Sequence, residues 1–313
     1  MRRWYKDILS DYTKEQDSLH EYDTKDKQVI DRKTNDEKVV HVPILKPGNF
    51  GERMAIDDKG IGGEGYTIIS NKETGKIAAL MSTTKSKIIN EILGNVDQPI
   101  RDKVKSVSRD LAEGYKNVSN NSFPKAYHVA DKFHIIQAAN DAVQDVRVKN
   151  RKEVLRKIRE KEIDKRQKFE NGETLKELLA RGRYQLFKFK KQWTETQEKR
   201  AEILFKEFPE IKKVYSQITR FRNIYKIKIG NKDKARISLK KWYRQSIQLN
   251  IEELNNFVCL VKNHEEEVLN YFDEGETNAY AESLNSRIQS FVNSNCGTRD
   301  IDFFHFRLMV YFA

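Results

Sequence analysis

The chain has 313 residues, which is enough for one large domain with an insertion or for two domains, each with a buried core. The chain is very polar, with 34% charged residues and a mean hydropathy of -0.79. It nevertheless contains 16 Phe, 13 Tyr and 3 Trp with only 5 Pro, which excludes a disordered chain and indicates a helix-rich fold. No apolar run approaches the ~20 residues of a membrane span, there is no signal-peptide core, and Cys259 and Cys296 have no metal-binding spacing, so we expect a soluble, cytoplasmic protein.

Positive charge is concentrated in one internal segment. The formal net charge of +12 and the pI near 9.4 point to a polyanionic partner, most simply nucleic acid. Residues 149–244 hold 31 Lys and Arg against 13 Asp and Glu, a net of +18, which leaves -6 elsewhere (12 minus 18). A solvated helical surface would account for many of these lysines, but so large and local an excess favours a surface that faces polyphosphate.

The first part of the chain is predicted to contain a polar segment, a linker and a group of strands. Residues 1–40 are polar and show neither zinc ligands nor a helix-turn-helix pattern, and residues 41–52 (HVPILKPGNFGE) are punctuated by Pro and Gly, which predicts a linker. Strands are predicted at 53–58 (RMAIDD), 65–70 (GYTIIS) and 76–81 (KIAALM). The turn NKETG between the last two strands indicates a β-meander.

Helices and strands alternate after this meander. The pattern predicts a helix at 84–93, a strand at 104–110, a helix at 111–118, a strand at 126–131 and a helix from Lys132 onward. Three meandering strands followed by this alternation are the order of a ribonuclease-H-like α/β domain with a mixed five-stranded sheet. Its later strands should be parallel because helices cross between them.

Acidic residues end two strands that should be neighbours in this sheet. The first strand pairs centrally with the fourth in this topology, so Asp57 and Asp110 are expected to lie close together at the strand ends, where open α/β sheets usually bind ligands. A third acid is expected on a later helix. The candidate is Glu282, which lies on a predicted helix whose Leu284 and Ile288 form an apolar face toward the sheet.

A long basic helical segment separates Asp110 from Glu282. Patterns such as EVLRKIRE and EILFKEFPEIKKVY predict an all-helical insertion, after which the chain returns to the sheet and ends in an aromatic run that packs the last helix. We therefore expect a polar amino-terminal segment, a catalytic domain in two parts and an insertion between them, at residues 1–40, 41–147 with 273–313, and 148–272 respectively.

Several segments occur together, in order, from about residue 41 to the end of the chain: HVPILKPGNFGERMAIDDKGIG, SVSRDLAEGY, HVADKFHII, NGETLKELLARGRY, QWTETQ and GETNAYAESLNSRIQSFVNSNCGTRDIDFF. In these segments the chain resembles the DDE transposases of bacterial insertion sequences, specifically the ISL3 group and its subset with a short amino end. The resemblance implies a ribonuclease-H-like catalytic domain with a helical insertion. It also implies metal-dependent cleavage and transfer of DNA strands at the ends of the element.

The resemblance also implies a role for particular residues. It places the two aspartates of the family on Asp57 and Asp110 and its glutamate on Glu282, as catalytic residues and metal ligands. Asp131 and His134 match the D-x-F-H motif of the family, and with Asp58 they are expected near the metal in supporting roles. Three carboxylates suit two Mg²⁺ ions (with Mn²⁺ as a substitute), which take oxygen ligands and assist in-line displacement at phosphorus.

Each of these assignments has a structural alternative. Asp57 would also suit a turn at a strand end, and Asp58 is an adjacent rival as the ligand. Asp110 and Asp131 each precede a predicted helix and would also suit its N-terminal cap. His134 would also suit a packed position in the core.

The expected partner is double-stranded DNA, both the element ends and the target, bound by a homo-oligomer in the nucleoid; no membrane is expected. Full-length relatives carry zinc-binding and helix-turn-helix regions that nothing before residue 41 matches. Either a separate end-recognition polypeptide supplies this function as a further partner, the open reading frame is truncated, or the basic insertion does more of the binding. Alternative functions are a DNA-binding protein without catalysis and a ribonuclease-H-like or resolvase-like nuclease. The candidates for DNA contact are Arg181, Arg183, Lys188, Lys190, Lys191, Arg287 and Arg299, although Arg299 is equally placed to pair with Asp300 or Asp302.

Overall fold

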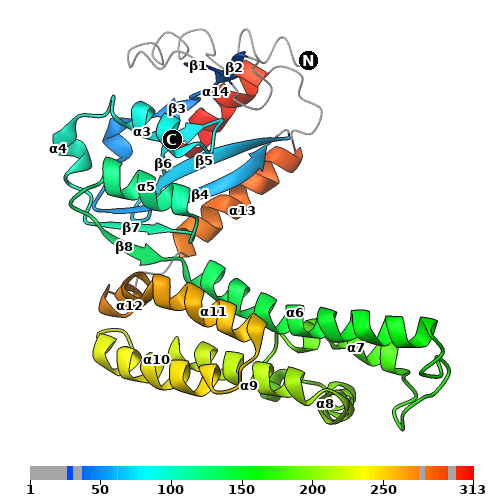
Figure 1. The fold of residues 1–313 in the computed structure, drawn as a ribbon. Helices are drawn as coiled ribbons and strands as arrows, with labels where there is room; N and C mark the ends of the chain where they lie inside the picture. Colours follow the sequence, from blue (N-terminus) through cyan, green and yellow to red (C-terminus); the bar gives the residue numbers. More distant parts are fainter. Residues whose placement is uncertain (1–26, 31–36, 62, 275–278, 295–300) are drawn as a thin grey trace. The chain divides into compact units, whose positions relative to one another are not determined.

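The computed structural model describes residues 27–30, 37–61, 63–274, 279–294 and 301–313. The chain divides into two compact units: residues 1–131 with 276–313, and residues 132–275 (Figure 1). The first unit contains a six-stranded sheet, and the second is built from helices over the part that is described. The predicted boundary between residues 147 and 148 falls inside helix α6 (Lys132–Arg159), and the division into four sequence domains stays a prediction.

The sheet of the first unit confirms the predicted α/β class. Its first three neighbour pairs are antiparallel and the last two are parallel, as expected for a meander followed by helical crossovers. In spatial order the strands are β3 (Ile44–Leu45), β6 (Ile77–Met81), β5 (Glu64–Asn71), β4 (Arg53–Ile61), β7 (Ser106–Arg109) and β8 (Tyr127–Ala130). A separate antiparallel pair is formed by β1 (Lys27–Ile30) and β2 (Glu37–Val40).

Two details of the predicted sheet are wrong. The sheet has six strands rather than five, because residues 41–52 are not simply a linker: Ile44 pairs with Leu80 and is fully buried. Two apolar residues between prolines are too short to show a strand period, and proline is tolerated at the edge of a sheet. The first strand also continues past Asp58 to Ile61, where it turns into β5 through Gly63 at a φ of +89°.

Helices cover both faces of this sheet (Figure 1). One face packs against α3 (Ser86–Leu93) and α5 (Glu113–Ser122) in a buried apolar core that includes Met54 and Ile56 of β4. The other face packs against α13 (Ala279–Ser294) and α14 (Ile301–Phe312) in a second core that includes Ile61 and Ile68. The side chains of β4 therefore alternate between two separate cores, as the period of a strand requires.

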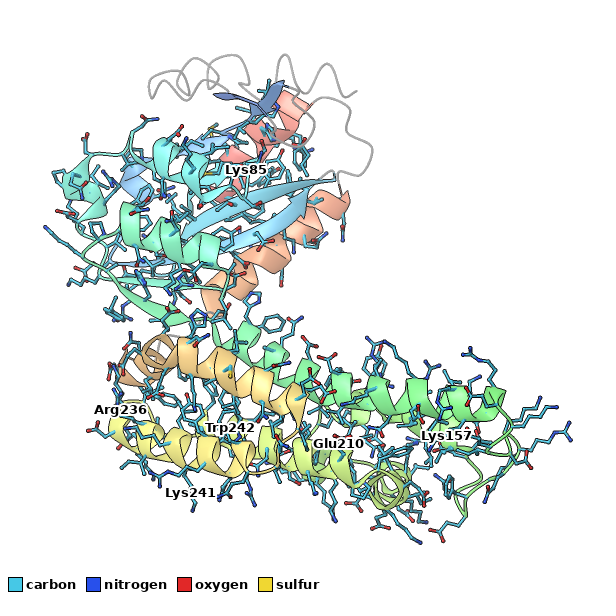
Figure 2. All side chains as sticks on the ribbon, viewed as in Figure 1. Lys85, Lys157, Glu210, Arg236, Lys241 and Trp242 are labelled. Atoms are coloured by element: carbon cyan, nitrogen blue, oxygen red, sulfur yellow. The ribbon has the colours of Figure 1, made fainter. Side chains whose placement is uncertain are left out.

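In the part of the second unit that the structure describes, six further α-helices follow the long helix α6. Thr174 and Thr194 each begin a helix with a capping box, and Pro209 begins the next, so local sequence sets these three starts. The buried ring of Trp242 lies 4.8 Å from Phe221 between centroids (Figure 2). The helices after α6 are α7 (Leu175–Gln185), α8 (Glu195–Glu207), α9 (Pro209–Ile224), α10 (Lys232–Ile247), α11 (Glu252–Asn263) and α12 (Glu265–Glu274).

One buried carboxylate holds the α7 and α8 region together. Glu173 has a side chain only 6% exposed, and it accepts hydrogen bonds from Nε and Nη2 of Arg200 at 2.6 to 3.0 Å. Arg181 adds a contact at 3.0 Å from Nη1 to Oε1 of the same carboxylate. Hydrogen bonds hold the pKa of Glu173 below its usual value, and the bonds from Arg200 contribute more than the bond from Arg181. A buried carboxylate is stable here because each oxygen is matched by a guanidinium donor.

We expect Glu173→Gln to lower the free energy of unfolding at pH 7 by roughly 1.5–3 kcal/mol, the range for hydrogen bonds to charged groups. Since the pKa of Glu173 is lowered by folding, its stabilisation is present above the ordinary glutamate pKa of about 4.3 and is lost as the pH falls through the lowered value. Urea unfolding of both proteins at neutral and acidic pH measures this, and the difference between them should shrink on acidification.

The matched control is Glu195→Gln, which removes an exposed carboxylate paired with Lys199 and should change the midpoint little at either pH. A difference between the Glu173→Gln protein and the unaltered chain that stays constant down to acidic pH would contradict the role given to this ion pair.

Candidate active site

The strand register brings two of the predicted acids together. The parallel pairing of β4 with β7 ends at Ile56 opposite Arg109, so Asp57 and Asp110 are the next residues on the two adjacent chains. Both side chains are partly buried. Asp57 lies within β4 rather than at its end, because β4 continues in antiparallel pairing with β5 after β7 has stopped. The backbones of Asp57 and Asp110 are thus adjacent, as predicted, at the point where β7 ends and β4 continues.

The pKa of the buried Tyr115 hydroxyl is affected by the same acids. Burial raises the pKa of Tyr115, and the negative charges of Asp58, Asp110 and Asp57 raise that pKa further. Its hydroxyl lies 3.2 Å from the hydroxyl of Thr67, which itself donates to the carbonyl of Thr83, so Tyr115 is the donor to Thr67. Three carboxylates therefore lie close enough to one phenol to affect its ionisation.

Asp57 and Asp58 occupy different faces of the sheet. Asp57 pairs with Ile68, whose side chain belongs to the core beneath α13, whereas Asp58 pairs with Thr67, whose side chain contacts Tyr115 of α5. Asp58 is exposed, and its backbone N–H donates to Oδ1 of Asp57 at 2.8 Å. The two carboxylates thus start from opposite faces, which favours Asp57 as the ligand that works with a residue of α13.

Asp110 does not cap the helix that follows it. The N-cap residue of α5 is Ala112, which makes no side-chain cap, and Oδ1 of Asp110 instead accepts from the backbone N–H of Ala112 at 2.9 Å. The backbone carbonyl of Asp110 accepts from Nη1 of Arg109 at 2.9 Å. These contacts orient the carboxylate in the turn between β7 and α5.

The third acid lies on a helix that packs against the face occupied by Asp57. Helix α13 contains position 282, and its Leu284 and Ile288 are buried in the same core as Tyr66 and Ile68 of β5. The side chain of Glu282 lies outside the described side chains, so its approach to the two aspartates stays a prediction.

Asp131 and His134 lie in different units. Asp131 follows β8, is 8% exposed, and its backbone N–H donates to the carbonyl of Arg109 at 2.8 Å. His134 lies in the first turns of α6, half-buried, with its ring edge-on to Phe133 at 5.6 Å. The supporting roles of both near a metal stay predictions.

Sequence reasoning missed two buried side chains at this place. Arg109 is 1% exposed although it is a charged residue inside a strand, and Tyr115 is 4% exposed. The only sequence signal for Arg109 was its position between Ser108 and Asp110 at the end of a predicted strand. Nothing local to Tyr115 indicates that its hydroxyl meets Thr67, which lies 48 residues earlier.

The acids offer suitable donors for a divalent cation. Mg²⁺ takes oxygen ligands and binds through one or two carboxylates while keeping some of its water, so Asp57 and Asp110 fit it in kind. Among the residues whose side chains the structure describes, no group of three or more His, Cys, Asp or Glu is gathered to hold a metal. The side chain of Glu282, which the resemblance would supply as the third ligand, is not among those described.

The basic candidates differ in how far they are already paired. Arg181 contacts Glu173 and Glu177, which competes with phosphate binding. Arg183 is exposed and lies over the ring of Tyr184, and Arg287 is exposed and lies over Phe312. Arg299 lies outside the described residues. The candidates that remain exposed in the segment between α7 and α8 are Lys188, Lys190 and Lys191.

A family model described as a transposase, of the DDE type and ISL3 group, matches residues 54–308. The searches of curated proteins and of solved structures each found no match. Within the residues that the structure describes, no helix has the length and apolar character needed to cross a membrane.

If Asp57 and Asp110 repel each other until a cation binds, Mg²⁺ or Mn²⁺ should stabilise the first unit. At a metal concentration well above the dissociation constant, we expect the Tm to rise by about 2–5 °C, and Asp110→Asn should remove most of that rise. Differential scanning fluorimetry with EDTA and with millimolar metal measures it. Glu113→Gln, three residues away and outside the acid cluster, should keep the full rise; an equal rise in the Asp110→Asn protein would exclude the site.

Proposed function

The chain belongs to the ISL3 family of DDE transposases, since the family model matches well over half of it, and we propose that it cuts and joins DNA strands at the ends of its own element through Asp57, Asp110 and Glu282. Membership in this family means an enzyme that acts on DNA. The observation that supports the finer proposal is the register of β4 and β7, in which Asp57 and Asp110 directly follow the paired residues Ile56 and Arg109.

The proposed roles follow from the surroundings of each acid. Asp57 and Asp110 would bind Mg²⁺ through one or both carboxylate oxygens, and their backbone contacts hold them in place before the metal arrives. A Mg²⁺ ion held there would supply the positive charge that assists the attacking and the leaving oxygen at phosphorus. Arg109 anchors the turn by its bond to the carbonyl of Asp110, so this guanidinium serves as a positioning group.

Glu282 would complete the site from helix α13, which packs against the sheet face that Asp57 occupies. Helix α13 is fixed by the burial of Leu284 and Ile288, two and six residues after Glu282, against β5. Rigid packing of this kind matters because phosphoryl transfer depends mainly on positioning and on charge neutralisation. A loosely held third carboxylate would lose most of that benefit.

The basic helical unit supplies the surface proposed for binding the DNA backbone. Figure 2 shows basic side chains along its helices, among them Lys157 on α6 and Lys241 on α10. Some of the positive charge is internal, since Arg200 and Arg222 are largely buried and bond to protein groups. The exposed lysines, in particular Lys188, Lys190 and Lys191, are the side chains available to phosphates.

Loss of any one proposed ligand should abolish strand cleavage. We expect Asp57→Asn, Asp110→Asn and Glu282→Gln each to reduce cleavage of DNA carrying the element ends by at least about a hundredfold, because each removes a carboxylate proposed to hold the Mg²⁺ whose charge would neutralise the reacting phosphate. Gel analysis of labelled end-containing DNA with Mg²⁺ measures the rate. Asp102→Asn is the control, since that carboxylate pairs with Lys125 on the surface.

Cleavage by the three variants at the rate of the control would reject the acid triad. Cleavage of ribonucleic acid–DNA hybrids or of four-way junctions in preference to element ends would instead favour a general nuclease on the same fold.

DNA affinity should depend steeply on salt because phosphate contacts release counterions. Replacing Lys188, Lys190 and Lys191 together by Ala should reduce the slope of log affinity against log salt by about one per lysine. Fluorescence anisotropy with labelled duplex over a salt series measures the slope. Lys199→Ala, an exposed lysine already paired with Glu195 at 2.8 Å, should change it less. A slope unchanged by the triple replacement would remove these lysines from the DNA surface.

A further inference from the structure

A recess of about 570 Å³ lies between α8 and α9 in the helical unit. This volume is within the roughly 300–1,000 Å³ of typical small-molecule sites. It includes the tryptophan of the segment QWTETQ, to which the proposed catalytic site gives no role. The recess is lined by three aromatic residues and three lysines: Trp193, Phe205, Tyr215, Lys190, Lys206 and Lys212.

The three aromatic rings form one cluster. The centroid of Trp193 lies 5.5 Å from that of Tyr215 and 6.2 Å from that of Phe205, and Phe205 lies 5.5 Å from Tyr215. Trp193 and Phe205 keep part of their surface accessible, whereas Tyr215 is 7% exposed. The floor of the recess is therefore aromatic, and part of it remains open to a ligand.

The polar atoms of these rings are already used by the protein. Nε1 of Trp193 donates to the carbonyl of Gln185 at 3.0 Å, and the hydroxyl of Tyr215 donates to the carbonyl of Lys188 at 2.9 Å. A ligand can therefore contact the aromatic faces of these rings, whereas the N–H of Trp193 and the hydroxyl of Tyr215 are already engaged. Such surfaces recognise flat rings by stacking.

The recess is also held in place before any ligand arrives. Trp193 directly precedes the N-cap residue Thr194, whose capping box with Gln197 fixes the start of α8. Gln185 further ties the two segments together, since its side chain donates to the carbonyl of Gln197 at 2.8 Å. A preformed aromatic surface binds a ring with little loss of conformational entropy.

The charges around the recess favour a nucleotide over an uncharged ring. Lys190, Lys206 and Lys212 lie at the recess and are exposed, within a segment of net charge +18, which suits the phosphates on either side of a base. Glu198 and Glu202 also lie there, and a carboxylate can accept from the exocyclic amino group of a base. Aromatic surface, lysines and acceptors together match a single nucleobase with its neighbouring phosphates.

We infer that this recess binds one unpaired nucleobase of the DNA on which the protein acts. The inference rests on the proposed function only in requiring that DNA is the substrate. A base inside a duplex is covered by its neighbours, so the ligand is a base that has left the stack at a bulge, a nick or a strand end.

The test compares two labelled duplexes, one fully paired and one with a single unpaired adenine, for binding to the full chain by fluorescence anisotropy. We expect the duplex with the unpaired adenine to bind roughly 5- to 100-fold more tightly than the fully paired duplex, the range that stacking of one base provides. Trp193→Ala should remove this preference while leaving affinity for the paired duplex within about twofold, since the phosphate contacts persist.

Two variants control for folding and for general aromatic content. Phe205→Leu keeps apolar volume but removes one ring, and should reduce the preference even if Trp193→Ala does not fold. Tyr184→Ala removes an exposed aromatic residue of the same unit that does not line the recess, and should leave the preference intact.

Equal binding of both duplexes by the unaltered chain would overturn the inference while leaving the proposed function in place. Absence of binding to either duplex would reject both. If neither Trp193→Ala nor Phe205→Leu alters the preference for the unpaired base, the recess does not hold a base. If these variants change only the oligomeric state, the recess instead receives a side chain of a second copy.

Discussion

The parallel pairing of β4 with β7 is the constraint on which the proposed catalytic site of the first unit depends. Side chains alternate between faces of a strand, so a slip of one residue in this register would send Asp57 toward α5 and separate it from Asp110. The two apolar cores resist such a slip, because Met54 and Ile56 would leave the core beneath α3 and α5 while Ile61 left the core beneath α13 and α14. The site geometry is therefore maintained by hydrophobic burial in two layers, and the carboxylates themselves contribute repulsion rather than stability.

The helical unit uses its positive charge for two purposes. Arg200 pairs with the buried Glu173, and Arg222 donates to the carbonyl of Phe187 at 3.2 Å and to Asn140, so these cations connect helices inside the unit. Exposed lysines such as Lys241 point outward instead. The net charge of the segment consequently overstates the charge that DNA can meet, and the arginines inside it matter for stability rather than for binding.

Much of this fold can be predicted from periodicity, but several features of the site cannot. A run such as IAALM is apolar enough to predict a strand, and the order of the predicted strands and helices predicts which strands pair. The edge strand at Ile44 escaped prediction because two residues show no period, and the extension of the first strand to Ile61 is dictated by its partner β5. Tyr115 became relevant only through contacts distant in sequence, and the position of the Glu282 carboxylate depends on side-chain packing that a helical pattern does not specify.

The short edge strand β3 has a further consequence for how copies of the protein can associate. Ile44 and Leu45 cover one side of β6, and the flanking Pro43 and Pro47 carry no backbone N–H for a further strand to use. Short, proline-bounded edges of this kind discourage continuous sheets that run from one molecule to the next. Copies that gather on a DNA molecule would therefore join through helical faces or through the nucleic acid itself, and their association can be reversible without the risk of strand-mediated aggregation.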